Sequence, residues 1–172
     1  NDGMFYYCTG TFVPVKHCGL AKIDMKTGVV IRAKHRYLPK ELKEQDFNHY
    51  GGCTYFEGKI YVAVEDLHRQ HPCLAVFDAD TLCFTGQYRI LGPEIQPNGN
   101  LPWCAADKEN RLLYTGYFND CDHINEFRID DLEWIRSIPI DRVVQHTQGG
   151  EMYDGLIYIS CHDSWKKKHI YA

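Results

Sequence analysis

The sequence predicts an all-β fold assembled from repeated units of four antiparallel strands. Residues 49–90 form the clearest unit, with short apolar stretches at 52–56, 59–65, 73–78 and 82–90 in up-and-down order. A tight Glu57-Gly58 turn joins the first two stretches, and an Ala79-Asp80-Thr81 turn joins the last two. Aromatic residues make up 13% of the 172 residues, with 12 tyrosines, and such side chains suit the half-buried surface of strands.

The other units repeat this layout. The first begins at a second strand, and a polar segment at 39–47, with room for one helical turn, leads from it into 49–90. A loop rich in Pro, Gly and Asn at 92–101 precedes the third unit. Asp24 and Asp78 close equivalent third strands, each at the start of an Asx turn. The strands of these three units are expected at 4–10, 19–24 and 29–37, at 102–107, 111–118, 124–129 and 132–139, and at 148–153, 156–161 and 169–172.

Equivalent positions recur at the spacing of propeller blades. The second strands share a tyrosine, at Tyr6, Tyr61, Tyr114 and Tyr158. Successive tyrosines are 55, 53 and 44 residues apart, which matches one four-stranded blade plus a variable connection. The units hold three, four, four and three strands, so the chain supplies about three and a half blades. A β-sandwich with evenly spaced strands is the alternative.

The blades follow a pattern of a double glycine, a glycine turn before an IYV-like strand, and an Asp-x-x-Thr turn. It stands at 51–52, 58–62 and 77–81, and its first half recurs at 149–150 and 155–159. The chain thereby resembles six-bladed β-propellers, the broad group of gluconolactonase-like and quinoprotein-like chains. The resemblance implies one propeller domain or fragment over 1–172, part of a larger six-bladed ring that a longer chain or another chain completes. Its blades are expected at about 4–38, 49–90, 102–140 and 148–172.

Charge and hydropathy narrow the classes of function. The net charge is −4, whereas nucleic-acid binding needs a clustered basic face, so we expect no nucleic-acid partner. No apolar run approaches the ~18 residues that cross a bilayer, so no membrane span is expected. The sequence contains no Gly-x-Ser-x-Gly, HExxH, P-loop or Rossmann motif.

The chain has eight cysteines, which is unusual for a cytosolic protein. Because no CxxC pair occurs, zinc-ribbon and thioredoxin-like sites are disfavoured. We therefore expect an extracellular, secreted protein with disulfides. Cys8 and Cys18 are the expected pair because they bracket one loop between adjacent strands. Cys53 and Cys104 occupy equivalent first-strand positions in neighbouring blades and are a second, more distant pair.

Blade topology predicts which end of the molecule carries a site. The loop between second and third strands lies on the same face as the connection into each first strand, and tight turns occupy the opposite face. The long polar loops all fall on the first face, called here the loop face, and such loops commonly carry function. The candidate ligand-binding residues there and at the channel mouth are His49, Asp66, His68, Trp103, Asp120, His146, Gln148, His162 and Asp163.

Two functions of different classes fit this face. The first is an extracellular binding or structural module that presents the loop face to a protein or small-molecule partner. The alternative, implied by the resemblance, is a metal-dependent hydrolase of lactonase or esterase type, with His49 and His146 as candidate ligands of a divalent ion such as calcium. A third possibility, a glutaminyl-cyclase-like propeller, is suggested only by residues 147–149 at the start of the last unit. In purely structural terms, the histidines bind backbone groups, the loop acids form turns and Trp103 packs in the core.

Overall fold

The computed structural model describes residues 3–12, 17–35, 37–164 and 167–172. These residues form strands and one short helix, α1 (Lys40–Lys43). The strands are β1 (Phe5–Phe12), β2 (His17–Asp24), β3 (Val30–His35), β4 (Phe47–Phe56), β5 (Lys59–Asp66), β6 (Cys73–Asp78), β7 (Phe84–Ile90), β8 (Cys104–Asp107), β9 (Leu112–Thr115), β10 (Cys121–Arg128), β11 (Trp134–Val144), β12 (Thr147–Tyr153), β13 (Leu156–Ser164) and β14 (Lys167–Tyr171).

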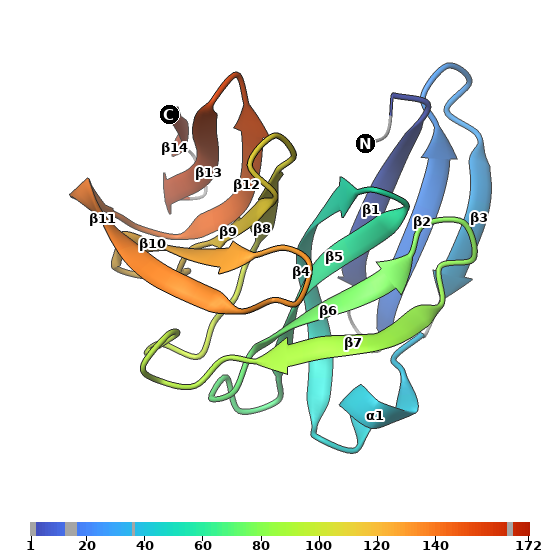
Figure 1. Cartoon of the computed structure of the whole chain (residues 1–172), viewed down its shortest axis with the longest axis horizontal. Coiled ribbons are helices and arrows are strands. Elements are labelled where there is room, and N and C mark those ends of the chain that lie inside the picture. Colours follow the sequence, from blue (N-terminus) through green and yellow to red (C-terminus); the bar gives the residue numbers. More distant parts are fainter. Residues whose placement is uncertain (1–2, 13–16, 36, 165–166) are drawn as a thin grey trace.

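The strands form four antiparallel sheets in sequence order (Figure 1). Their orders are β1-β2-β3, β4-β5-β6-β7, β8-β9-β10-β11 and β12-β13-β14. Over the described residues this confirms the predicted all-β fold with units of three, four, four and three strands. The single turn of α1 confirms the helical turn expected within 39–47. No helix in the described ranges is long and apolar enough to cross a membrane.

Tight turns join strands within each sheet. In Glu57-Gly58, between β4 and β5, φ is 43° and 76°, and in Asp154-Gly155, between β12 and β13, φ is 49° and 74°. Two successive positive φ values are typical of the hairpin turn whose twist matches that of strands. Asp78 accepts hydrogen bonds from the Thr81 backbone N–H and hydroxyl at 2.7 and 2.6 Å, and Asp24 caps the turn after β2 in the same way. These contacts confirm the predicted turns.

The hydrophobic core lies between neighbouring sheets. Successive side chains of a strand point to opposite faces, so β5, which is buried along almost its whole length, serves two cores. Val62 packs in a cluster with Leu20 of β2, whereas Tyr61 packs with Phe127 of β10. A third cluster around Trp103 joins the last two sheets. Each sheet is therefore stabilised by its neighbours along the chain.

Double glycines let the innermost strands approach β8 from both sides. A Cβ on Gly51 of β4 would lie 2.6 Å from the Pro102 carbonyl oxygen, and the Gly52 N–H donates to that oxygen at 2.7 Å. A Cβ on Gly150 of β12 would overlap the Trp103 ring. Real Cβ atoms do not come so close to other atoms, so the double glycines of the repeat are packing positions at the centre of the molecule.

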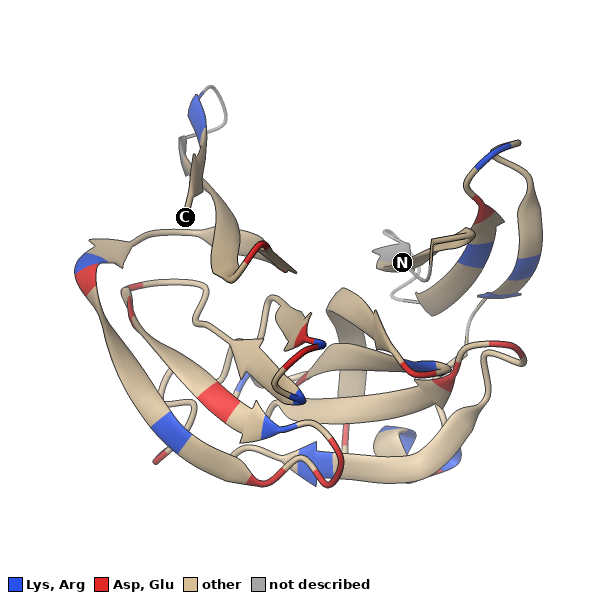
Figure 2. Ribbon diagram, turned by 45° about the horizontal axis from the view of Figure 1, so that its top comes forward, with Lys and Arg blue, Asp and Glu red and all other residues tan. Residues whose placement is uncertain are grey.

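The four sheets stand in an arc, with the first and last sheets at its two ends (Figures 1 and 2). Along the arc β1 packs on β4, β4 on β8 and β8 on β12. The end sheets expose large apolar side chains, among them Tyr6 and Ile31 at one end and Leu156 and Ile170 at the other. The described chain is thus a partial propeller.

The predicted Cys8–Cys18 disulfide is absent, and none of the eight cysteines, all of which lie in the described ranges, forms a disulfide. In the β1–β2 register Cys8 lies opposite Ala21, and Cys18 lies opposite Thr11. The two cysteines are three positions out of register, which places their side chains on opposite faces of the sheet. Bracketing a loop therefore did not bring the two sulfur atoms together.

The largest departures from the predicted strand bounds are in β4 and β11. The first strand of the second unit, β4, begins at Phe47 instead of residue 52, because its pairing with β5 continues across register shifts until Phe47 lies opposite Asp66. In the third unit, β11 continues to Val144, which pairs with Cys121 of β10 beyond another register shift. The bulges hide these extensions in the sequence because they interrupt the period-2 pattern.

Candidate functional site: the mouth pocket

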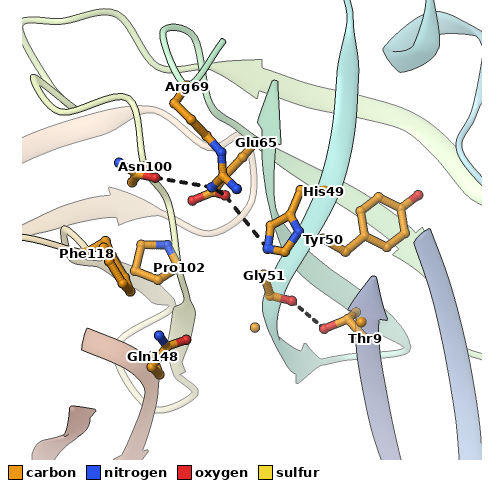
Figure 3. A pocket seen from close by; sticks show the side chains of 12 residues that line it. Thr9, His49, Tyr50, Gly51, Glu65, Arg69, Asn100, Pro102, Phe118 and Gln148 are labelled. Atoms are coloured by element: carbon orange, nitrogen blue, oxygen red, sulfur yellow. Dashed lines mark hydrogen bonds and ion pairs between the residues drawn. The ribbon is translucent and has the colours of Figure 1, made fainter. Parts of the chain in front are cut away.

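A cavity of about 590 Å³ lies near the centre of the arc and is called here the mouth pocket (Figure 3). Its walls come from strands of the first, second and fourth sheets and from loops around the third. The side chains that face it include Thr9 of β1, His49 of β4, Glu65 of β5, Gln148 of β12 and the loop residues Arg69, Asn100, Pro102 and Phe118.

Glu65 supplies the buried carboxylate of the mouth pocket, with a side chain only 3% exposed. Its Oε1 accepts the Leu101 N–H at 2.8 Å. Its Oε2 forms an ion pair with Arg69 Nη1 and lies 3.8 Å from His49 Nε2. An unpaired buried carboxylate is strongly destabilising because it has lost its water. Glu65 therefore holds Arg69 at the pocket.

The loop that carries Arg69 is ordered by Asp66. The Asp66 carboxylate, 5% exposed, accepts the backbone N–H of His68 at 2.7 Å and that of Gln70 at 3.0 Å, and also that of His71. Asp66 was a predicted site residue, and its carboxylate binds the backbone of its own loop. The His68 side chain is exposed, and neither residue lines the mouth pocket.

A second loop meets Arg69 from the third sheet. Arg69 Nη1 donates to Asn100 Oδ1 at 3.2 Å, and Asn100 Nδ2 donates to the Asn98 carbonyl oxygen at 3.1 Å. Gly99 has a positive φ of 62°, and a Cβ there would overlap the Arg69 backbone carbonyl. Only glycine lets the two loops come together in this way.

His49 is neutral in this setting at pH 7. Burial, followed by the nearby positive charge of Arg69, lowers the pKa of His49 below its ordinary value. The lining of the mouth pocket thus carries one buried negative charge, on Glu65, and one positive charge, on Arg69, whose side chain is 44% exposed. The other polar side chains of the lining are neutral: the amides of Asn100 and Gln148 and the hydroxyls of Thr9 and Tyr50.

A histidine pair adjoins the mouth pocket. The rings of His146 and His162 stack, with centroids 4.9 Å apart and planes 9° from parallel. His146 Nδ1 lies 2.9 Å from the His162 carbonyl oxygen, and Phe118 packs edge-on against His146. Gln148 Nε2 lies 3.4 Å from His162 Nε2. Phe118 and Gln148 line the pocket, so three of the predicted site residues, His146, Gln148 and His162, come together beside it.

The remaining predicted site residues lie elsewhere. Trp103 is fully buried, and its Nε1 donates to Thr147 Oγ1 at 3.0 Å, so the indole packs in the core and presents no surface to a ligand. Asp120 is exposed, and it accepts a hydrogen bond from Gln145 Nε2 at 2.6 Å. The side chain of Asp163 lies outside the described residues.

The two candidate metal ligands have separate surroundings, because His49 lies beside Glu65 whereas His146 stacks on His162. Among the described residues, no group of three or more His, Cys, Asp or Glu side chains is placed to hold a metal ion. The hydrolase alternative therefore finds no ligand set in the part of the chain that the structure describes.

Sequence reasoning missed the ion pair that organises the pocket. Glu65 reads as the polar end of an apolar strand, and Arg69 reads as one of several polar residues in a solvated loop. One signal was present: a strand that is otherwise apolar ends on two adjacent acids, Glu65 and Asp66, with an arginine four residues after the first. Buried acids need partners, and a nearby arginine is the natural one.

Comparisons with known proteins identify the fold. Neither a known protein family nor a curated protein matches the sequence. Among solved structures, the chain resembles hydrazine synthase of Kuenenia stuttgartiensis, with a TM-score of 0.60 and 10% identity over 99% of this chain and 56% of that chain. It also resembles the Dos1 propeller, with a TM-score of 0.54 and 13% identity over 99% and 42% of the two chains. For Sqt1 of Saccharomyces cerevisiae the TM-score is 0.56, with 9% identity over 98% and 45%.

These likenesses confirm the β-propeller fold, and at such low identity they establish the fold alone. The chain spans about half the length of the solved structures it matches. What distinguishes this propeller is therefore to be found in its own side chains, and in the mouth pocket first.

Proposed function

We propose that the protein is an interaction module that holds a segment of a protein partner in the mouth pocket on its loop face. The observation that carries this proposal is the pocket itself. Its volume of about 590 Å³ falls within the range of ~300–1,000 Å³ typical of ligand sites. It combines polar groups, such as Gln148, with apolar surface from Pro102 and Phe118. One or two side chains of a partner segment fit such a space.

The rigidity of the pocket supports the proposal. Glu65 fixes Arg69, Asp66 fixes the loop backbone, and Gly99 lets the neighbouring loop approach. A site that is already in its binding geometry loses less conformational entropy when a partner binds. The likeness to other propellers supports the scaffold only, and the binding role rests on the pocket.

Selection from a random peptide library displayed on phage tests the proposal, with the whole chain as bait. The Thr9 side chain lies at the pocket, where its hydroxyl donates to the Gly51 carbonyl oxygen at 2.5 Å (Figure 3), so Thr9→Trp places an indole in the cavity. Lys26→Trp is the matched control, because Lys26 lies in the exposed turn after β2. We expect selected peptides to bind Thr9→Trp at least about tenfold more weakly than the wild type, and to bind Lys26→Trp unchanged.

Peptides that bind all three proteins equally would contradict the proposal, as would a library that yields no peptide sensitive to Thr9→Trp. Circular dichroism and a urea titration of each variant confirm that the fold is retained, so that lost binding reports the pocket and not unfolding.

A further inference from the structure

We infer that the mouth pocket takes a carboxylate group of the partner segment, supplied by an acidic side chain or by a C-terminus, and that Arg69 is the residue that binds it. This inference rests on the proposed function, and it names the chemistry of the ligand.

Arg69 is fixed in place by one nitrogen and keeps donors on the others. Its contacts with Glu65 and Asn100 both use Nη1. A guanidinium has five N–H donors, so within the described residues the Nε and Nη2 donors have no protein acceptor. Those two nitrogens form the edge of the guanidinium that matches a carboxylate bidentately. With 44% of its side chain exposed, Arg69 keeps surface that a ligand can contact.

The charges of the pocket favour a singly charged anion over a cation or a phosphate. Arg69 is the one exposed charge among the described lining residues, since Glu65 is 3% exposed and His49 is neutral at pH 7 because its pKa is lowered. A cationic ligand would meet Arg69 first and be repelled. A phosphate carries a charge of about −1.5 to −2 at pH 7, so it would leave excess negative charge beside the Glu65 carboxylate. Because Glu65 already neutralises Arg69, a carboxylate leaves a net charge of only about −1 in the pocket, less than a phosphate would leave.

The surroundings of Arg69 fit a peptide that carries the carboxylate. His49 and Gln148 can each donate a further hydrogen bond to an oxygen in the pocket. Phe118 and Pro102 offer apolar surface to the remainder of the segment. Figure 3 shows Phe118 and Gln148 across the pocket from His49. The lining thus provides a carboxylate site on one side and a packing surface on the other.

The carboxylate site is tested by NMR, by following the Arg Nε–H resonances of the whole chain while sodium acetate or acetamide is added. Arg111 is a matched internal control: its side chain is 46% exposed, and it pairs with Glu57 at 2.8 Å and Asp130 at 2.6 Å, away from the pocket. We expect acetate, and not acetamide, to shift the Arg69 resonance saturably and to leave Arg111 unchanged. Equal responses at Arg69 and Arg111, or equal responses to acetate and acetamide, would overturn the inference.

Three peptides then separate the two sources of the carboxylate. Acetyl-Gly-Gly-Asp-Gly-Gly-amide offers a side-chain carboxylate, acetyl-Gly-Gly-Gly offers a C-terminal one, and acetyl-Gly-Gly-Asn-Gly-Gly-amide offers neither. We expect at least one carboxylate peptide to bind at least about tenfold more tightly than the Asn peptide, and Arg69→Gln to abolish the difference while Arg111→Gln preserves it. If all three bind alike and Thr9→Trp removes their binding, the proposed function stands and the carboxylate inference fails. If acetate binds at Arg69 while no peptide binds the pocket, the protein-partner function fails and the carboxylate site stands.

Discussion

Burial of His49 beside Arg69 makes one residue of the mouth pocket a reporter of pH. Because its pKa in the folded protein is lowered, the unfolded chain takes up a proton at this residue first as pH falls below the ordinary histidine pKa of about 6.5. The unfolded state then binds more protons than the folded state, so the free energy of unfolding decreases as the pH is lowered. We expect His49→Gln to lose less stability than the wild type between pH 7.5 and about pH 5.5, as measured by urea unfolding.

Because the pH dependence of the variant is compared with that of the wild type, the contributions of the other histidines to the change in stability cancel. His68→Gln, on the exposed part of the neighbouring loop, provides the surface control for loss of a histidine. If His49→Gln lost as much stability on acidification as the wild type, the pKa of His49 would not be lowered in the folded state.

The same residue shows how far a site can be predicted from sequence. Strand alternation fixes which loops share a face, so His49 and Gln148 could be assigned to the loop face from the order of strands alone. Which side chains then face the pocket depends on the register shift between Tyr50 and Cys53 in β4 and on the path of the 67–72 loop. The Arg69–Glu65 pair arises from that tertiary geometry, which no local pattern encodes.

Among the elements, the innermost strands depend on their glycines. A Cβ on Gly150 would overlap the buried Trp103 ring, whereas a Cβ on Gly149 would meet only the Ser160 hydroxyl, at 2.9 Å. Overpacking a rigid core costs about 1–3 kcal/mol, and a terminal hydroxyl can rotate away. We therefore expect Gly150→Ala to lower the free energy of unfolding by about 2 kcal/mol and Gly149→Ala to lower it by less, as measured by urea titration.

A smaller side chain at Trp103 should relieve the overlap. In a double-mutant cycle, Gly150→Ala should cost less in a Trp103→Leu background than in the wild type. Equal costs for Gly149→Ala and Gly150→Ala, with no coupling to position 103, would show that β12 is free to move away from β8.

The strands and turns were largely predictable because their signals are local. Period-2 apolar stretches and positive-φ turns such as Glu57-Gly58 need only neighbouring residues to form. The extended starts and ends of β4 and β11 were not predictable, since pairing there crosses bulges. The Cys8–Cys18 disulfide was wrongly predicted for a related reason. The two cysteines bracket one loop, but the register of the hairpin places their thiols on opposite faces of the sheet.

At the scale of the whole molecule, we expect the two end sheets to determine whether the protein self-associates in solution. They expose Tyr6 and Ile170, and in the described residues β1 and β14 are edge strands that pair on one side only. Unpaired edges and exposed apolar faces promote association, so we expect the 172-residue chain to form larger species as its concentration rises in sedimentation-velocity experiments.

The double variant Tyr6→Lys, Ile170→Lys should shift the distribution towards monomer. Val143→Lys changes an apolar residue of β11, in a middle sheet, whose exposure lies between those of Tyr6 and Ile170, and it should leave the association unchanged. If the chain stays monomeric at every concentration, or if Val143→Lys reduces association as much as the double variant does, the end sheets are not the surfaces that associate.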